Sequence, residues 1–380
     1  MKIQVDGTNT LNKGAELMLY AVLEEIEPKY PNAKIIYNSF GKGYKEINTS
    51  LKISGDLRLS YGFYPGIILS KLKLPYQYFT NFYPKKDIDI LLDASGFRLG
   101  DQWNRNKQYI KTLELYYKAL KANGTKIILL PQALGPFSTV VGKETARVLN
   151  EYADLIIARE SYSHKYLIEA NVNPDKVIVS PDFTNLVKGV LPTQYDSISG
   201  KVCIIPNKKM LTHTSFGKGK YLELIQNVIQ TVIESGHGVF ILNHEGAGDM
   251  EICNSINAMF NNELQIITNL TAKEVKGVIG ASYFTFSSRY HGVASALSQV
   301  VPCLATSWSH KYQLLFKDYG LENQVIDLDS SQGDVQSRIK NYLDANNNKS
   351  MRDAIRERKG ALENTSRAMW NQVWKVANQS

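Results

Sequence analysis

The densest group of chemically useful side chains lies in residues 287–292, which read Ser-Ser-Arg-Tyr-His-Gly. A predicted strand ends here, and a predicted helix over residues 293–298 follows. A guanidinium, an imidazole, two hydroxyls and the free N–H groups of a helix N-terminus would therefore converge at one point. This combination favours an anionic ligand, bound by Ser288 and Arg289, with His291 as a general acid or base. The alternative is that His291 only caps the helix.

Two other segments place positive charge directly after predicted strands. Arg159 follows one strand pattern, where a guanidinium can hold a carboxylate or phosphate through two parallel hydrogen bonds. The alternative for this arginine is a surface ion pair with Glu160. His310 and Lys311 follow a later strand pattern. Lys311, with His310 beside it, would add a second cation to the same edge of the cleft as Arg289.

Further polar groups follow the other predicted strands. Asp93 and Asp101 flank a turn that either holds a ligand, with one aspartate as a base, or is simply solvated. Gly14 precedes the first helix pattern, where a glycine lets a ligand approach the backbone; an ordinary helix start is the alternative. The remaining candidates carry amide, carboxylate or imidazole groups in short loops at strand ends: Asn12, Glu16, Gln132, Asn243, His244 and Glu245.

Metal and cofactor patterns are weak in this sequence. Two Asp-x-Asp triplets occur, at residues 87–89 and 327–329, but a three-residue pattern arises by chance in most chains of this length. His291 and His310 lack a third ligand in register. The three cysteines are about fifty residues apart and form no zinc or disulfide framework. We therefore predict no metal site and no bound cofactor.

The elements that position these residues alternate between strands and helices. This alternation predicts parallel βαβ units with right-handed crossovers, and it occurs twice, before and after a turn-rich segment at residues 187–200. We predict an α/β protein of two Rossmann-like domains facing a cleft, the architecture called GT-B, with the site at the carboxyl ends of the strands. The expected parts are a domain over 1–190 with an aromatic and basic insertion at 57–86, a domain over 201–345, and a C-terminal helix over 346–380 that packs back on the N-terminal domain.

Composition narrows the classes of partner. The 380-residue chain carries a net charge of +8 but no run of five basic residues and no nucleic-acid-binding motif, so we expect no nucleic-acid partner. The first residues lead directly into a strand pattern, and no apolar run approaches the ~20 residues that cross a bilayer, which favours the cytoplasm. Residues 57–86 carry five basic side chains, eight aromatic ones and no acidic one. They predict either a lid on the inner face of an anionic membrane or a packed tyrosine-rich loop.

Taken in order along the chain, these segments resemble the polysaccharide pyruvyl transferase family. The matching pieces, spread over about residues 1–325, are Asn12-x-Gly14, Pro131-Gln132-x-x-Gly135-Pro136, Ala158-Arg159-Glu160-x-x-Ser163, Pro181-Asp182 and Arg289-x-His291-Gly292. Two departures stand out. The family usually has aspartate at the position of Ala15, and three glycines where this chain has residues 94–96.

The resemblance implies an enzyme whose donor and co-substrate is phosphoenolpyruvate and whose product is a pyruvate ketal on a sugar of a cell-surface polysaccharide precursor. It implies that Arg159, Arg289 and Lys311 hold the donor and that His291 moves a proton. Asp93 or Asp101 would orient the acceptor hydroxyl. The acceptor stays open between free, nucleotide-linked and lipid-linked saccharides. The alternatives are a nucleotide-sugar glycosyltransferase of the same architecture and a non-catalytic saccharide-binding protein.

Overall fold

The computed structural model describes residues 1–10, 12–38, 54–56, 82–83, 88–212, 218–307 and 311–379. Its chain forms two compact units. The first unit comprises Met1–Leu11, Met18–Phe183 and Thr365–Ser380, and the second comprises Asn12–Leu17 and Thr184–Asn364. His310 and almost all of the predicted insertion at 57–86 lie outside the described residues.

The described part of the first unit contains an eight-stranded parallel sheet in the order β4-β3-β2-β1-β5-β6-β7-β8. Its strands are β1 (Lys2–Asp6), β2 (Lys34–Asn38), β3 (Ser54–Asp56), β4 (Phe82–Tyr83), β5 (Ile90–Asp93), β6 (Lys126–Gln132), β7 (Leu155–Ala158) and β8 (Val177–Val179). β5 and β7 are buried along their whole length. Continuous apolar burial of this kind is typical of a parallel sheet that is covered on both faces.

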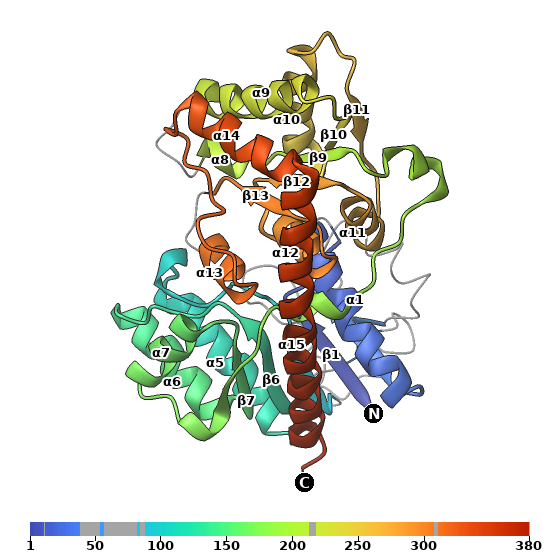
Figure 1. Ribbon diagram of the computed structural model, residues 1–380. Helices are drawn as coiled ribbons and strands as arrows, with labels where there is room; N and C mark the ends of the chain where they lie inside the picture. The colour runs from blue at the N-terminus through green and yellow to red at the C-terminus, as the bar shows by residue number, and fades with distance from the viewer. Residues whose placement is uncertain are drawn as a thin grey trace. The chain divides into compact units, whose positions relative to one another are not determined.

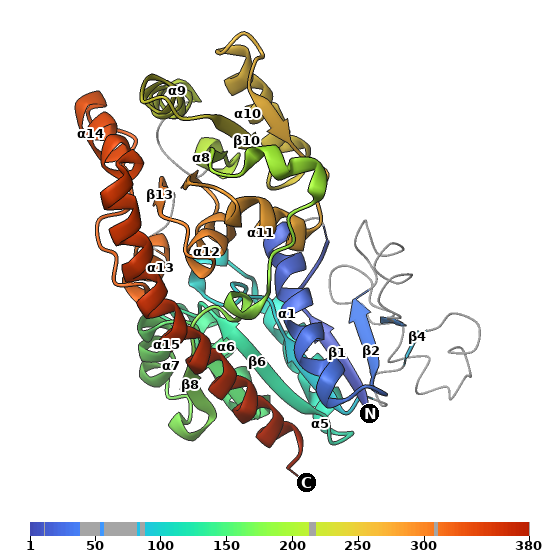
Figure 2. The ribbon, with the colours of Figure 1, turned by 45° about the vertical axis from the view of Figure 1, so that its right-hand side comes forward.

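Helices cover the two faces of this sheet. Those of the first unit are α1 (Lys13–Lys29, from Met18 onward), α5 (Lys107–Lys121), α6 (Val140–Tyr152), α7 (Ser161–Glu169) and the last turns of α15 (Ala345–Ala377). Ile127 and Leu129 of β6 pack with α5, α6 and α7 in one core. α1 and the end of α15 lie side by side on the other face (Figures 1 and 2), where Tyr30 contacts Trp374 edge to face.

The described part of the second unit contains a five-stranded parallel sheet in the order β11-β10-β9-β12-β13. Its strands are β9 (Val202–Ile205), β10 (Val239–Leu242), β11 (Gln265–Ile267), β12 (Phe284–Ser287) and β13 (Cys303–Ala305). One face packs against α11 (Ala272–Gly280), α12 (Tyr290–Ser298) and α13 (Lys311–Asp318). The other packs against α9 (Lys218–Glu234), α10 (Gly246–Ala258) and α14 (Gln332–Leu343). The short helices of the chain are α8 (Lys209–Thr212), η3 (Asp101–Trp103), η4 (Pro174–Lys176), η5 (Phe183–Leu186) and η6 (Thr193–Ile198).

The C-terminal helix α15 contributes to both units. In the second unit, the Arg352 guanidinium donates to the carbonyls of Val300, Ser282 and Tyr283, at the ends of α11 and α12. In the first unit, Trp370 is buried against Phe183. Two parallel sheets with flanking helices confirm the predicted α/β class. Among the described residues, no helix combines the length and apolarity that a membrane span requires.

Two helices begin earlier than the sequence pattern predicted. α12 starts at Tyr290 rather than residue 293, and α1 starts at Lys13 rather than Ala15. The predicted starts followed the first aliphatic side chain of each stripe, whereas the helices open with Lys13-Gly14 and Tyr290-His291-Gly292. As a result, His291 and Gly14 belong to first helical turns and not to loops.

Candidate functional site

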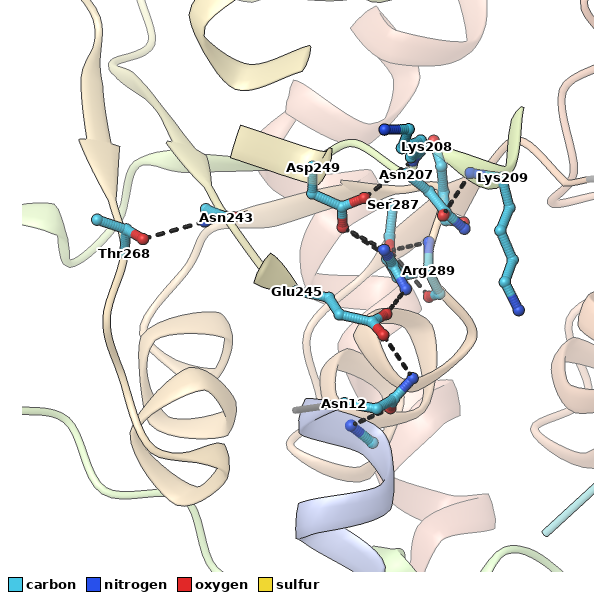
Figure 3. A network of polar contacts seen from close by, with 12 residues as sticks. Asn12, Asn207, Lys208, Lys209, Asn243, Glu245, Asp249, Thr268, Ser287 and Arg289 are labelled. Atoms are coloured by element: carbon cyan, nitrogen blue, oxygen red, sulfur yellow. Dashed lines mark hydrogen bonds and ion pairs between the residues drawn. The ribbon is translucent and has the colours of Figure 1, made fainter. Parts of the chain in front are cut away.

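The centre of the candidate site in the second unit is the guanidinium of Arg289 (Figure 3). Arg289 follows β12 and occupies the N-cap position of α12. Its Nε donates to Asp249 Oδ2 at 2.8 Å, and its two terminal nitrogens pair with Asp249 and Glu245. The side chain is only 11% exposed. A buried arginine held by two carboxylates is a fixed cation at a helix N-terminus.

Asn12 extends this network. Its Nδ2 donates to Glu245 Oε1 at 3.0 Å, while its Oδ1 accepts from the backbone N–H groups of Gly14 and Ala15 and so caps α1. The structure thus joins three predicted residues, Asn12, Glu245 and Arg289, in one chain of contacts (Figure 3). Asp249 was not among the residues predicted from the sequence. It lies four residues after Glu245, in the first turn of α10, and this spacing was the available signal.

His291 stands in the first turn of α12 beside α1. A Cβ on Gly14 would lie 2.1 Å from the imidazole Nδ1, so only glycine fits at this position. The Tyr290 ring contacts the imidazole edge to face, with 5.3 Å between the ring centres. His244, after β10, is buried, and its Nδ1 meets no hydrogen-bond partner in the described part of the chain. The close approach to Gly14 and the contact with Tyr290 hold His291 in the first turn of α12, next to the N-cap residue Arg289.

Lysines add positive charge to this edge of the sheet. Lys208 and Lys209 follow β9: the Lys208 N–H donates to Asp249 Oδ1 at 2.9 Å, and the Lys209 N–H donates to Asn207 Oδ1 at 2.9 Å. The Lys311 ammonium lies 5.1 Å from the centre of the Tyr290 ring. The two lysines after β9 were not predicted from the sequence, although they too lie directly after a strand of a parallel sheet.

Burial and mutual repulsion shift the titration of these groups. Burial lowers the pKa of Arg289 to about 10, so the guanidinium stays charged at neutral pH. Burial, and then the charge of Arg289, lower the pKa of Lys209. Burial also lowers the pKa of His244 well below its usual range, with Arg289, His291 and Lys13 adding to the effect. A bound anion would stabilise the charged forms of these groups, because it would offset their mutual repulsion.

Three other predicted residues have structural contacts in this unit. Ser288 is fully buried, and its Oγ accepts a hydrogen bond from the Tyr221 hydroxyl at 2.8 Å. Asn243 donates to Thr268 beside the neighbouring strand β11, apart from the arginine network (Figure 3). Glu16 accepts from the Ala272 N–H at the start of α11 and pairs with Lys13. These contacts hold the side chains of Ser288, Asn243 and Glu16 in place.

Asp93 belongs to the first unit, where it ends β5 and is completely buried. One carboxylate oxygen accepts from the N–H and hydroxyl of Ser95, and the other pairs with Arg98. The amide of Gln132, another predicted residue, donates to Asp93 at 3.2 Å. Donors therefore occupy both oxygens of this carboxylate, which ties residues 95, 98 and 132 to the end of β5.

Asp101 has a comparable anchoring geometry nearer the surface. Its oxygens accept from the N–H and hydroxyl of both Ser138 and Thr139, at 2.6–3.0 Å. Burial would raise the pKa of Asp101, but these four hydrogen bonds outweigh it and lower the pKa below its usual range. The aspartate therefore ties the turn after β5 to the start of α6.

Arg159 is buried in the first unit beside two carboxylates. Its guanidinium lies 3.8 Å from both Glu160 and Asp182. Glu160 in turn accepts from the Ser163 hydroxyl, whose oxygen accepts the Leu134 N–H at 2.7 Å. The Ala-Arg-Glu-x-x-Ser and Pro-Gln-x-x-Gly-Pro motifs are thus joined by direct hydrogen bonds. In the described ranges, no group of three or more His, Cys, Asp or Glu side chains has the geometry of a metal site.

Comparison with known proteins gives one family and one fold. The family model described as polysaccharide pyruvyl transferase matches residues 12–310. No curated protein matches the chain in sequence. The UDP-GlcNAc 2-epimerase of Neisseria meningitidis, bound to UDP-GlcNAc, aligns with a TM-score of 0.64 at 12% identity over 99% of this chain and 100% of its own. HepE of Anabaena, in complex with UDP and glucose, aligns with a TM-score of 0.62 at 12% identity over 100% and 99%. MnaA of S. aureus with UDP gives 0.61 at 12% identity over 98% and 95%. These likenesses show a shared GT-B-like fold.

Proposed function

Because the chain belongs to the polysaccharide pyruvyl transferase family, we propose that it transfers the pyruvyl group of phosphoenolpyruvate to two hydroxyls of a saccharide. The products are a pyruvate ketal and inorganic phosphate. The observation that carries the proposal is the buried Arg289 at the N-cap of α12, with His291 in the first turn of that helix.

The donor carries two anionic groups, a phosphate and a carboxylate, and the second unit offers matching cations. Arg289 and the positive N-terminal end of α12 would bind one of them. Lys209 would bind the other: burial and then the charge of Arg289 lower its pKa, and a bound anion would stabilise its charged form. Lys311, next to Tyr290, lies at the same helix start. Arg159, which is buried beside Asp182 and Glu160 in the first unit, stays a predicted anion-binding residue.

The reaction requires a proton at the methylene carbon and a cation-stabilising environment at the enol carbon. His291 donates the proton to the methylene carbon as one acceptor hydroxyl attacks the enol carbon, and that hydroxyl's proton passes to the imidazole. Loss of phosphate with its electron pair then leaves an oxocarbenium centre. The second hydroxyl attacks this centre and closes the ketal, and its proton passes to the released phosphate. Fixed cations around the departing phosphate lower the barrier to this step because they need no reorganisation.

The test combines ligand binding with turnover. Phosphoenolpyruvate should raise the melting temperature of the wild-type protein, since a ligand at ~100 times its Kd adds ~2.7 kcal/mol to stability. Arg289→Lys should abolish that rise because an ammonium cannot reproduce the paired guanidinium contacts. Arg356→Lys, at an exposed arginine of α15, is the matched control and should keep the rise.

Turnover is followed by phosphate release and by the methyl signal of the ketal, with a panel of saccharide acceptors. His291→Ala should reduce it by about 100-fold with an unchanged melting temperature. Stabilisation by UDP-sugars alone, with no response to phosphoenolpyruvate, would contradict the proposal and assign the protein to the nucleotide-sugar glycosyltransferases.

A further inference from the structure

The loop that connects β5 to α5 presents an exposed tryptophan. Trp103 ends the short helix η3 and is 37% exposed, whereas Trp370 and Trp374 are buried. The loop begins at the carboxyl end of β5, a central strand of the first sheet. Ligands of parallel α/β sheets bind outside the carboxyl ends of the strands. An exposed indole at this edge therefore calls for a functional account.

The turn that carries Trp103 is held rigidly. Asp101, two residues earlier, accepts the four hydrogen bonds from Ser138 and Thr139 described above, and its N–H donates to the Pro136 carbonyl at 3.1 Å. Asn104 follows in the left-handed region with φ 45°, which turns the chain sharply toward α5. A side chain held in this way loses little conformational entropy when it binds a ligand.

Aromatic and cationic side chains surround the indole. The Phe97 ring contacts the indole edge to face, with 5.2 Å between the ring centres. The Arg105 guanidinium lies 5.7 Å from the centre of the Trp103 ring and 4.6 Å from that of Tyr109. Gln102 and Asn104, on either side of Trp103 in the sequence, are exposed. We name Phe97, Trp103, Arg105 and Tyr109, with these two amides, the aromatic platform.

We propose that the aromatic platform binds a saccharide, and that in the reaction proposed above it holds the acceptor; this second clause rests on the proposed function. A pyranose ring has an apolar C–H face and a rim of hydroxyls. The indole of Trp103 offers a flat apolar surface for the C–H face. The side-chain amides of Gln102 and Asn104 and the guanidinium of Arg105 offer directional donors, and the amides also acceptors, for the hydroxyl rim.

A saccharide fits the platform better than a lipid surface does. A membrane-binding face needs an apolar stripe that enters the headgroup region, together with a cluster of basic residues. The platform has one exposed aromatic ring and one basic side chain, Arg105, and uncharged amides flank the ring in the sequence. Single aromatic rings among planar polar groups are suited to stacking a ring-shaped polar ligand.

The test measures saccharide binding in the absence of donor. The intact protein is titrated with a panel of tetrasaccharides of hexoses and N-acetylhexosamines, and Kd is measured for every member that binds. Trp103→Ala should weaken binding by about tenfold or more, because it removes the flat apolar surface on which the C–H face of the sugar would stack. Trp103→Phe, which keeps a flat ring, should retain most of the affinity. Leu115→Ala removes another exposed apolar side chain, on α5, and should change nothing.

The outcomes separate this proposal from the previous one. Failure of every tetrasaccharide to bind the wild-type protein, or equal affinity in Trp103→Ala, would overturn the platform. Binding to vesicles of anionic phospholipid that disappears in Trp103→Ala, with saccharide affinity unchanged, would instead assign the platform to a membrane. The melting-temperature rise with phosphoenolpyruvate should be the same in all three variants. If phosphoenolpyruvate does not bind but the saccharide does, the result contradicts the proposed reaction and supports the aromatic platform.

Discussion

The imidazole of His291 fills the space in which a side chain at position 14 would stand. Its Nδ1 lies 2.1 Å from the ideal Cβ position of Gly14, and its Cγ lies 2.6 Å from it. No real contact of a Cβ atom is that short, so the pair works only with glycine. The Asn-x-Gly motif of the first helix and the Arg-x-His motif of α12 are therefore complementary parts of one arrangement.

Gly14→Ala should displace His291 without removing it. We expect turnover to fall by about 100-fold, as for loss of a general acid, while phosphoenolpyruvate still raises the melting temperature through Arg289. Gly333→Ala is the matched control, since Gly333 also lies in the first turn of a helix and a Cβ there meets nothing within 4 Å. Full turnover in Gly14→Ala would show that the position of the imidazole is not important for the reaction.

Arg289→Gln should destabilise the second unit as well as abolish donor binding. It leaves Asp249, which is 1% exposed, without its cationic partner. Removing one member of a buried ion pair costs about 3–5 kcal/mol, measurable as a lower free energy of unfolding in urea. The double variant Arg289→Gln/Asp249→Asn should regain part of that stability, because no uncompensated charge remains, yet show no response to phosphoenolpyruvate. Recovery of donor binding in the double variant would exclude Arg289 from the donor site.

His244 should make stability depend on pH on the acidic side. Burial and nearby positive charges lower its folded-state pKa well below the ordinary value of 6.5. Below that value the unfolded chain binds a proton that the native state excludes, so stability is present above pH 6.5 and is lost as the pH falls toward the folded-state pKa. His244→Gln should flatten the curve of unfolding free energy between about pH 5 and 6.5. An identical slope in the variant would place the effect elsewhere.

Ser163→Ala should weaken the first unit rather than the chemistry. The Ser163 oxygen accepts the buried N–H of Leu134, and an unsatisfied buried donor costs about 1–3 kcal/mol. We expect a lower melting temperature and near-normal turnover at low temperature. Ser161→Ala, at the exposed first position of the same helix, controls for the loss of a hydroxyl in α7 and should leave the melting temperature unchanged.

Local patterns were sufficient to predict the fold class and the strand ends that carry the polar residues. Strand and helix periodicities are properties of neighbouring residues, and parallel strands place their carboxyl ends at one edge of a sheet. The loops after β10 and β12 could therefore be assigned to the same edge before the structure was known. The predicted starts of α1 and α12 were late because the first residues of these helices carry no aliphatic side chain.

The sequence by itself determined the two alternating halves, the family motifs and the loops at which they lie, since each depends on short-range spacing. Only the tertiary structure decided which partner each polar group meets. Asp93 and Asp101 are candidate bases by sequence, and only the structure shows which neighbouring side chains and N–H groups donate hydrogen bonds to them. Asp249 and Lys209 carried no motif, yet packing of neighbouring strand ends brings them to Arg289. Partner choice depends on contacts between residues far apart in the chain, and these form only when the sheet brings its loops together.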